Sequence, residues 1–119
     1  MELPEELTAE GYEEVPYPGS PYPETHPDRL ATIATLLGLD PAPPERCRVL
    51  ELGCGDAGNL IPMASLLRDS RFVGVDLSGR AVARAGAQIA SLGLENVEVR
   101  RLDLLEIGED IGRFDYLFL

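Results

Sequence analysis

The sequence predicts an α/β fold built on an open, all-parallel sheet. Short apolar runs that are typical of buried strands alternate with longer stretches whose apolar residues recur at helical spacing. Such alternation indicates parallel strands of one sheet, joined by helical crossovers. The chain has 119 residues, of which 45% are hydrophobic, and this is enough for one packed domain.

The first 24 residues are expected to form an arm, and the domain is expected to occupy 25–119. The arm is rich in glutamate, proline and tyrosine, and its repeated prolines exclude a regular helix or a central strand. Two interpretations stay open. The arm is either flexible, or it folds over a ligand site through Tyr12, Tyr17 or Tyr22.

The pattern becomes helical at Thr25. Thr25 or His26 can cap a helix, Pro27 suits its first turn, and Gly38 can end it. We therefore interpret His26 as a helix-start residue in preference to a catalytic base. Strands are expected at 48–52, 71–75, 97–102 and 114–119, and further helices at 59–68 and 78–92, with Asn59 and Ser78 as their caps.

Right-handed crossovers give the predicted sheet the strand order 3-2-1-4 and place helices 59–68 and 78–92 on one face. Only the short acidic segment 106–112 is left for the other face, which we expect to be poorly covered. The sequence stops in the fourth strand, so the sheet is expected to be truncated there with an unpaired edge. Exposed apolar surface and unpaired edges favour association, so self-association through this face or edge is expected.

The charge and the cysteines narrow the class of protein. A net charge of −11 repels phosphate backbones and anionic membranes, so we expect neither nucleic acid nor membrane as a partner. The spacing of Cys47 and Cys54 suits neither a metal knuckle nor a disulfide framework. We expect reduced thiols, a cytoplasmic location and no metal site.

A glycine-rich turn, ELGCGDAG from Glu51 to Gly58, follows the first predicted strand. Glycines allow a tight turn and a close ligand approach, and the helix that follows directs free N–H groups at that ligand. Gly53, Gly55 and Gly58 also fit the dinucleotide fingerprint, so the NAD-binding domain of an oxidoreductase stays an alternative. A domain that only mediates interactions is a second alternative.

Three acidic residues stand at predicted strand ends. Asp76 can accept hydrogen bonds from ribose hydroxyls in an NAD site and in other nucleoside sites alike. Glu51 would be repelled by a pyrophosphate and attracted by a ligand that carries ammonium and sulfonium groups. Asp103 can accept a hydrogen bond from an adenine amine. Simpler interpretations are a solvated acid for Glu51, a helix cap for Asp76 and a turn residue for Asp103.

The segments VLELGCGDAG, FVGVDLS, RLDLLE and FDYLFL follow one another in the order of motifs I to IV of class I S-adenosylmethionine-dependent methyltransferases, which the chain resembles over 48–119. The resemblance implies a Rossmann-like sheet and S-adenosylmethionine as the cofactor. It implies these roles: Gly53, Gly55 and Gly58 at the methionine moiety, Glu51 at its amino end, Asp76 at the ribose, and Asp103 with Leu104 at the adenine. The implied cofactor-binding set is completed by Cys54, Asn59 and Leu77.

One position departs from the family's E-x-G-x-G-x-G pattern, because Ala57 stands where the third glycine is expected and Gly58 follows one place late. Asp115 falls where the fourth motif often has an acid. The segment YPETHPDRLATIATLL resembles bacterial methyltransferases that carry a regulatory region downstream. Further strands of the family's full sheet bring the acceptor pocket, so the resemblance implies methyl transfer to an unknown acceptor and assigns no catalytic residue.

Overall fold

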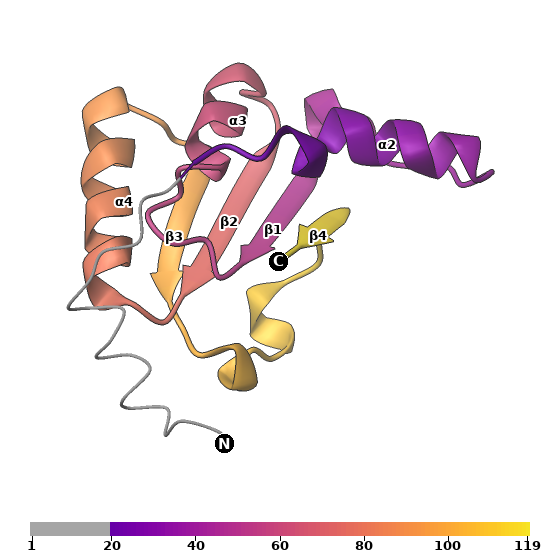
Figure 1. The fold of residues 1–119 in the computed structure, drawn as a ribbon. Coiled ribbons are helices and arrows are strands. Elements are labelled where there is room, and N and C mark those ends of the chain that lie inside the picture. Colours follow the sequence, from indigo (N-terminus) through magenta and orange to yellow (C-terminus); the bar gives the residue numbers. More distant parts are fainter. Residues whose placement is uncertain (1–19) are drawn as a thin grey trace.

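The computed structural model describes residues 20–119, which form an α/β fold around one parallel sheet (Figure 1). Its order, β3-β2-β1-β4, confirms the predicted order. The strands are β1 Arg48–Leu52, β2 Arg71–Asp76, β3 Val97–Arg101 and β4 Tyr116–Phe118. The helices are α2 Pro27–Leu36, α3 Leu60–Leu66 and α4 Gly79–Leu92, and the 3₁₀ turns are η1 Pro23–Thr25, η2 Pro44–Arg46, η3 Leu104–Glu106 and η4 Glu109–Ile111. Tyr12 and Tyr17 of the expected arm lie outside the described residues.

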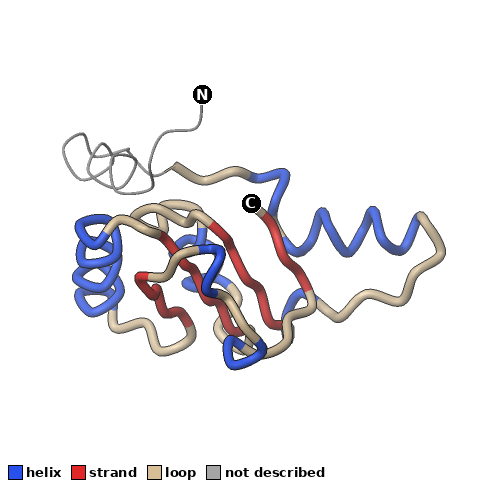
Figure 2. The backbone as a smooth tube through the Cα atoms, turned by 90° about the horizontal axis from the view of Figure 1, so that it is seen from below, coloured by secondary structure: helices blue, strands red, loops and turns tan. Residues whose placement is uncertain are grey.

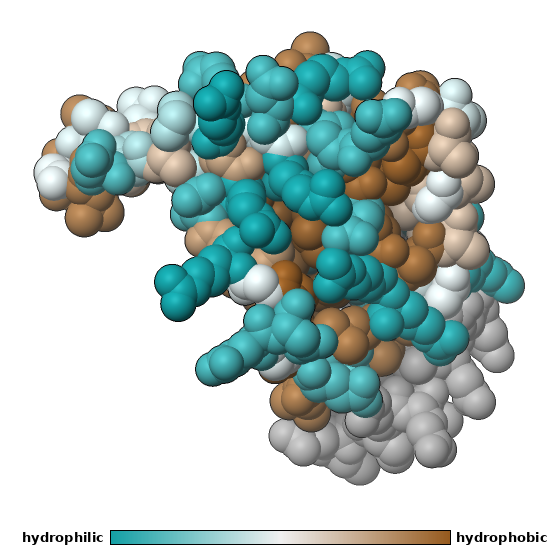
Figure 3. Space-filling view, turned by 180° about the vertical axis from the view of Figure 1, so that it is seen from behind, coloured by the Kyte–Doolittle hydropathy of each residue, from teal (hydrophilic) through white to brown (hydrophobic). Residues whose placement is uncertain are grey.

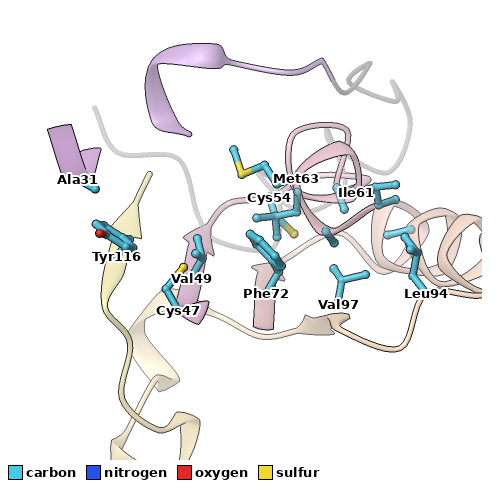
Figure 4. Close-up of a cluster of buried hydrophobic side chains, with 14 residues drawn as sticks. Ala31, Cys47, Val49, Cys54, Ile61, Met63, Phe72, Leu94, Val97 and Tyr116 are labelled. Atoms are coloured by element: carbon cyan, nitrogen blue, oxygen red, sulfur yellow. The ribbon is translucent and has the colours of Figure 1, made fainter. Parts of the chain in front are cut away.

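One face of the sheet packs against α3 and α4. The side chains of Tyr116, Val49, Phe72 and Val97, one from each strand, lie in a row on this face (Figure 4). They pack in one cluster with the apolar side of α3 and with Ala85 of α4, as the right-handed crossovers predict. Full burial of a side chain such as Phe72 contributes about 2 kcal/mol, so this cluster holds the two helices on the sheet.

The opposite face is better covered than the sequence analysis predicts. Leu50, Val73 and Val75 on this face are all buried, in a cluster with Ile111 of η4. The prediction of a poorly covered face is wrong at β1 and β2. The 3₁₀ turns η3 and η4, between β3 and β4, allow the few apolar residues of this stretch to fold back onto the strands. Leu117 of β4 stays more than half exposed. Self-association through that edge stays a prediction.

Helix α2 begins as predicted, with the His26 Nδ1 accepting a hydrogen bond from the Asp28 N–H. Of its residues, Ala31 and Leu30 reach the core cluster. The rest of α2 projects beyond β4, at the end of the sheet opposite α4 (Figure 2). Its outer end carries exposed hydrophobic surface, to which Leu36 and Leu37 contribute (Figure 3).

The fourth strand is shorter than the predicted 114–119. The Asp115 carboxylate accepts a hydrogen bond from the Arg48 N–H at 2.8 Å, at the amino end of β1. Phe114 packs into the cluster on the second face, with the Arg48 guanidinium 5.2 Å from its ring centre. These contacts draw residues 114 and 115 out of the strand, and pairing with β1 begins at Tyr116.

Gly74, in the middle of β2, faces the glycine-rich turn. A Cβ added there would lie 2.6 Å from the Cys54 Sγ and 2.9 Å from the Leu60 Cδ1, closer than real contacts allow. We therefore expect Gly74→Ala to lower the free energy of unfolding by about 2 to 3 kcal/mol, because the turn and α3 must both move. Urea denaturation followed by circular dichroism measures this change.

Gly86→Ala is the matched control, because Gly86 lies within α4 and an added Cβ there meets no atom within 4 Å. Alanine is the better helix former, so this variant should gain about 0.5 to 1 kcal/mol. Equal stability of the two variants would show that β2 does not require a glycine at position 74.

Candidate functional site

The glycine-rich turn leaves β1 at the edge of the sheet where the carboxyl ends of the parallel strands meet. Gly53 (φ +70°), Gly55 (φ +58°) and Ala57 (φ +64°) all have left-handed backbone conformation. Ala57 thus adopts the conformation for which the family pattern has its third glycine, and Gly58, one place later, does not replace it. An L-residue in this conformation costs roughly 1 to 2 kcal/mol, and the full burial of the alanine methyl partly offsets that cost.

Asp76, the last residue of β2, accepts hydrogen bonds from the backbone of two segments, the glycine-rich turn and the start of α4. Its Oδ2 accepts a hydrogen bond from the Gly55 N–H at 2.8 Å, and its Oδ1 accepts one from the Ser78 N–H at 2.9 Å. Bonds from N–H groups to a carboxylate are stronger than those between neutral groups. Asp76 therefore joins the glycine-rich turn to the start of α4. Each oxygen keeps a further lone pair for a ligand hydroxyl.

Glu51 lies in β1 beside the turn, and the residue is 7% exposed. Burial raises the pKa of Glu51 to about 7, a hydrogen bond from Asn59 opposes the rise, and the nearby charge of Asp76 adds to it. The bond runs from the Asn59 Nδ2 to the Glu51 Oε2 at 3.0 Å. A cation placed next to such a buried carboxyl group favours its ionised form.

Asn59 stands at the N-cap of α3, where it was expected, but its side chain does not cap the helix. It spans from β1 to the segment before α2. The Nδ2 donates to the Thr25 Oγ1 at 2.9 Å as well as to Glu51, and the Oδ1 accepts from the Tyr22 N–H at 2.7 Å. The expected capping role is therefore wrong, because these longer-range partners use all the polar atoms of the amide.

Asp103 lies at the same edge but is engaged locally. The Leu102 N–H donates to the Asp76 carbonyl, which places Asp103 just beyond the end of β3. Its Oδ1 accepts a hydrogen bond from the Leu105 N–H at 2.9 Å and so caps η3. Leu104 is about half exposed, and the carbonyl of Leu77 accepts a hydrogen bond from the Arg101 Nε at 3.1 Å. The structure links Asp76 to the turn through Gly55 and Glu51 to Asn59, the residue after the turn, and places Asp103 one strand further out.

The other polar and reactive residues near the turn have structural roles. Cys54 is buried against the sheet, and burial raises the pKa of its thiol well above the usual range, which leaves it unreactive. Asp56, which was not among the predicted site residues, accepts a hydrogen bond from the Gly58 N–H and pairs with Arg84 at 3.6 Å. Asp115 lies at the opposite edge of the sheet.

Among residues 20–119, no group of three or more histidine, cysteine, aspartate or glutamate side chains is placed to hold a metal ion. No helix in that range is long and apolar enough to cross a membrane.

A parallel sheet in the order 3-2-1-4, with a glycine-rich turn after β1 and an acid at the end of β2, is the arrangement of the class I methyltransferase fold. The family model described as "Methyltransferase domain" matches residues 49–119. The chain belongs to this family.

The chain is also similar to curated relatives and to solved structures. An uncharacterized protein of Rickettsia prowazekii is 43% identical over 106 residues, which is 89% of this chain and 19% of the relative. PKMT2 from Rickettsia typhi, solved in complex with AdoHcy, is 37% identical with a TM-score of 0.82, over 86% of this chain and 20% of that one. A protein-L-isoaspartate O-methyltransferase is 27% identical with a TM-score of 0.56, over 76% and 28%. The chain thus spans about a fifth of the first two proteins.

Proposed function

We propose that this chain is the part of a methyltransferase domain that binds S-adenosylmethionine. The observation that carries the proposal is a buried Glu51 and an Asp76 at the ends of neighbouring strands, both hydrogen-bonded to the glycine-rich turn or to the residue that follows it. S-adenosylmethionine and S-adenosylhomocysteine, the product it becomes (abbreviated AdoHcy), bring an ammonium group and a ribose that suit these two acids.

The proposed roles follow from the position of each side chain. Glu51 holds the amino group of the ligand. Burial raises the pKa of its carboxyl, and a neighbouring ammonium group would stabilise the ionised form. Asp76 accepts hydrogen bonds from the ribose hydroxyls with the lone pairs that Gly55 and Ser78 leave free. The remaining proposed contacts are Gly53, Cys54, Gly58 and Asn59 around the methionine moiety, Leu77 beside the ribose, and Asp103 with Leu104 at the adenine.

In the whole protein, the cofactor would supply a methyl group from its sulfonium to a nucleophilic acceptor. Such a transfer depends mainly on holding the two reactants in line. The described residues contribute this by fixing the amino group at Glu51 and the ribose at Asp76.

The charge of Glu51 also distinguishes this proposal from NAD binding. The carboxylate attracts an ammonium group and repels a pyrophosphate. We expect isothermal titration calorimetry of the chain at pH 7.5 to detect binding of S-adenosylhomocysteine and none of NAD at the same concentration. Binding of NAD in preference to S-adenosylhomocysteine would assign the domain to the oxidoreductase class. Binding of neither ligand would favour a domain that only mediates interactions.

A further inference from the structure

The segment 22–25, which precedes α2, is hydrogen-bonded to the candidate site through the side chain of Asn59. Within it, Tyr22 and Thr25 provide the two groups that Asn59 contacts, and Asn59 contacts Glu51 with the same amide. Asn59 is 4% exposed, so these contacts are made away from solvent. Residues 37 and 34 positions before Asn59 are thereby linked, through Asn59, to the carboxyl that we propose for the amino group of the cofactor.

The partners of Asn59 dictate which way its amide faces. The Tyr22 N–H is a donor, so it requires the Oδ1. The ionised Glu51 carboxylate is an acceptor, so it requires the Nδ2, and the second hydrogen of the Nδ2 goes to the Thr25 hydroxyl. Rotating the amide by 180° would face donor to donor and acceptor to acceptor. The segment therefore fixes the orientation in which Asn59 can donate to Glu51.

The apolar side chains of this segment and of α3 leave an open pocket between them. The pocket has a volume of about 170 Å³ and is lined mainly by Tyr22, Pro23 and His26 on one side and by Pro62, Met63 and Leu66 on the other. Atoms that line a pocket lack packing contacts on that side. The segment makes two hydrogen bonds with Asn59, and the Thr25 hydroxyl that accepts one of them donates to the Tyr22 carbonyl at 2.8 Å.

We propose that Asn59 is a positioning residue that couples the segment 22–25 to Glu51, so that this segment sets how strongly the site holds the amino group of its ligand. The proposal rests on the function proposed above. It assigns to residues 22–24 of the expected arm, and to Thr25 that follows them, a role at the site that does not require a contact with the ligand. Thr25 is the most informative position for a test, because it reaches Glu51 only through Asn59.

The test compares Thr25→Val, which removes the hydroxyl while keeping the shape, with Thr25→Ser, which keeps the hydroxyl. Each variant is titrated by calorimetry with S-adenosylhomocysteine and with methylthioadenosine, a nucleoside that has no amino group beyond its adenine. We expect Thr25→Val to weaken the affinity for S-adenosylhomocysteine about fivefold, the effect of one hydrogen bond. Its affinity for methylthioadenosine should change less than about twofold, and Thr25→Ser should match the wild type for both ligands.

The two ligands separate coupling from general damage to the fold. Equal weakening of both ligands by Thr25→Val, or unchanged affinity for S-adenosylhomocysteine, would overturn the coupling and leave the proposed function in place. Failure of the wild-type chain to bind S-adenosylhomocysteine would overturn the proposed function itself, and with it the coupling.

Discussion

Asp76→Asn is expected to weaken the affinity for S-adenosylhomocysteine roughly 100-fold, the equivalent of one or two hydrogen bonds to a charged group. The substitution keeps the shape of the side chain but turns one acceptor oxygen into a donor. That donor would face the N–H of either Gly55 or Ser78, both of which now donate to Asp76. The same change removes the carboxylate from the ribose. Isothermal titration calorimetry measures the affinity.

Asp76→Asn should also lower the free energy of unfolding by about 1 to 3 kcal/mol, because it loses one of the hydrogen bonds from the Gly55 and Ser78 N–H groups. Asp115→Asn is a matched control, because the Asp115 carboxylate also accepts a backbone N–H bond, from Arg48, but at the opposite edge of the sheet. The control should lose some stability and keep its affinity. If both variants lost affinity to the same extent, the effect of Asp76→Asn would reflect stability alone, and Asp76 would have no direct role at the ribose.

The sheet and its helices could be predicted from the sequence because their signals are local. His26 and Ser78 accept the N–H bonds that begin α2 and α4, and Gly93 ends α4 at φ +63°, as their positions in the sequence indicate. The apolar runs of β1 and β2 are buried on both faces, which is typical of a parallel sheet. The crossover rule then leaves one strand order.

The network around Asn59 could not be predicted, because it depends on contacts between distant segments. An asparagine before a helix gives the same local pattern whether it caps that helix or reaches elsewhere. Here it reaches Thr25 and Tyr22, which are brought to it by the path of the chain into α2. Ala57 is a different case, because the sequence shows that a glycine is missing but not that the alanine takes the same left-handed conformation.

The position of Glu51 and Asp76 beside the turn could be predicted, but the electrostatic state of Glu51 could not. Its raised pKa depends on burial beneath the turn and on the distance to Asp76, and both are properties of the folded chain. The coverage of the second face was missed for a related reason. Ile107 and Ile111 are spaced four apart in an acidic segment, and only the 3₁₀ turns bring them over β1 and β2.

Glu51→Gln is expected to stabilise the chain at pH 8. The pKa of Glu51 rises from 4.5 to about 7 on folding, so the folded state binds more protons than the unfolded state between these values. Stability that comes from this group is therefore full below pH 4.5, falls as the pH rises to 7, and is constant above. The span corresponds to about 3 kcal/mol as an upper bound, which the neutral amide would recover at pH 8 while it still accepts from Asn59.

The same substitution should weaken the binding of S-adenosylhomocysteine, because the ammonium group of the ligand needs the ionised carboxylate. In the wild type, binding must release the proton from Glu51, so the affinity should rise up to about tenfold per pH unit as the pH approaches 7. Glu51→Gln should lose this dependence between pH 5.5 and 7. Calorimetry in two buffers of different ionisation enthalpy counts the released proton, and urea denaturation at each pH gives the stability difference.

Parallel affinity curves for the two proteins would mean that the ligand's amino group does not contact Glu51. Parallel stability curves would mean that Glu51 is ionised in the free protein across the whole range.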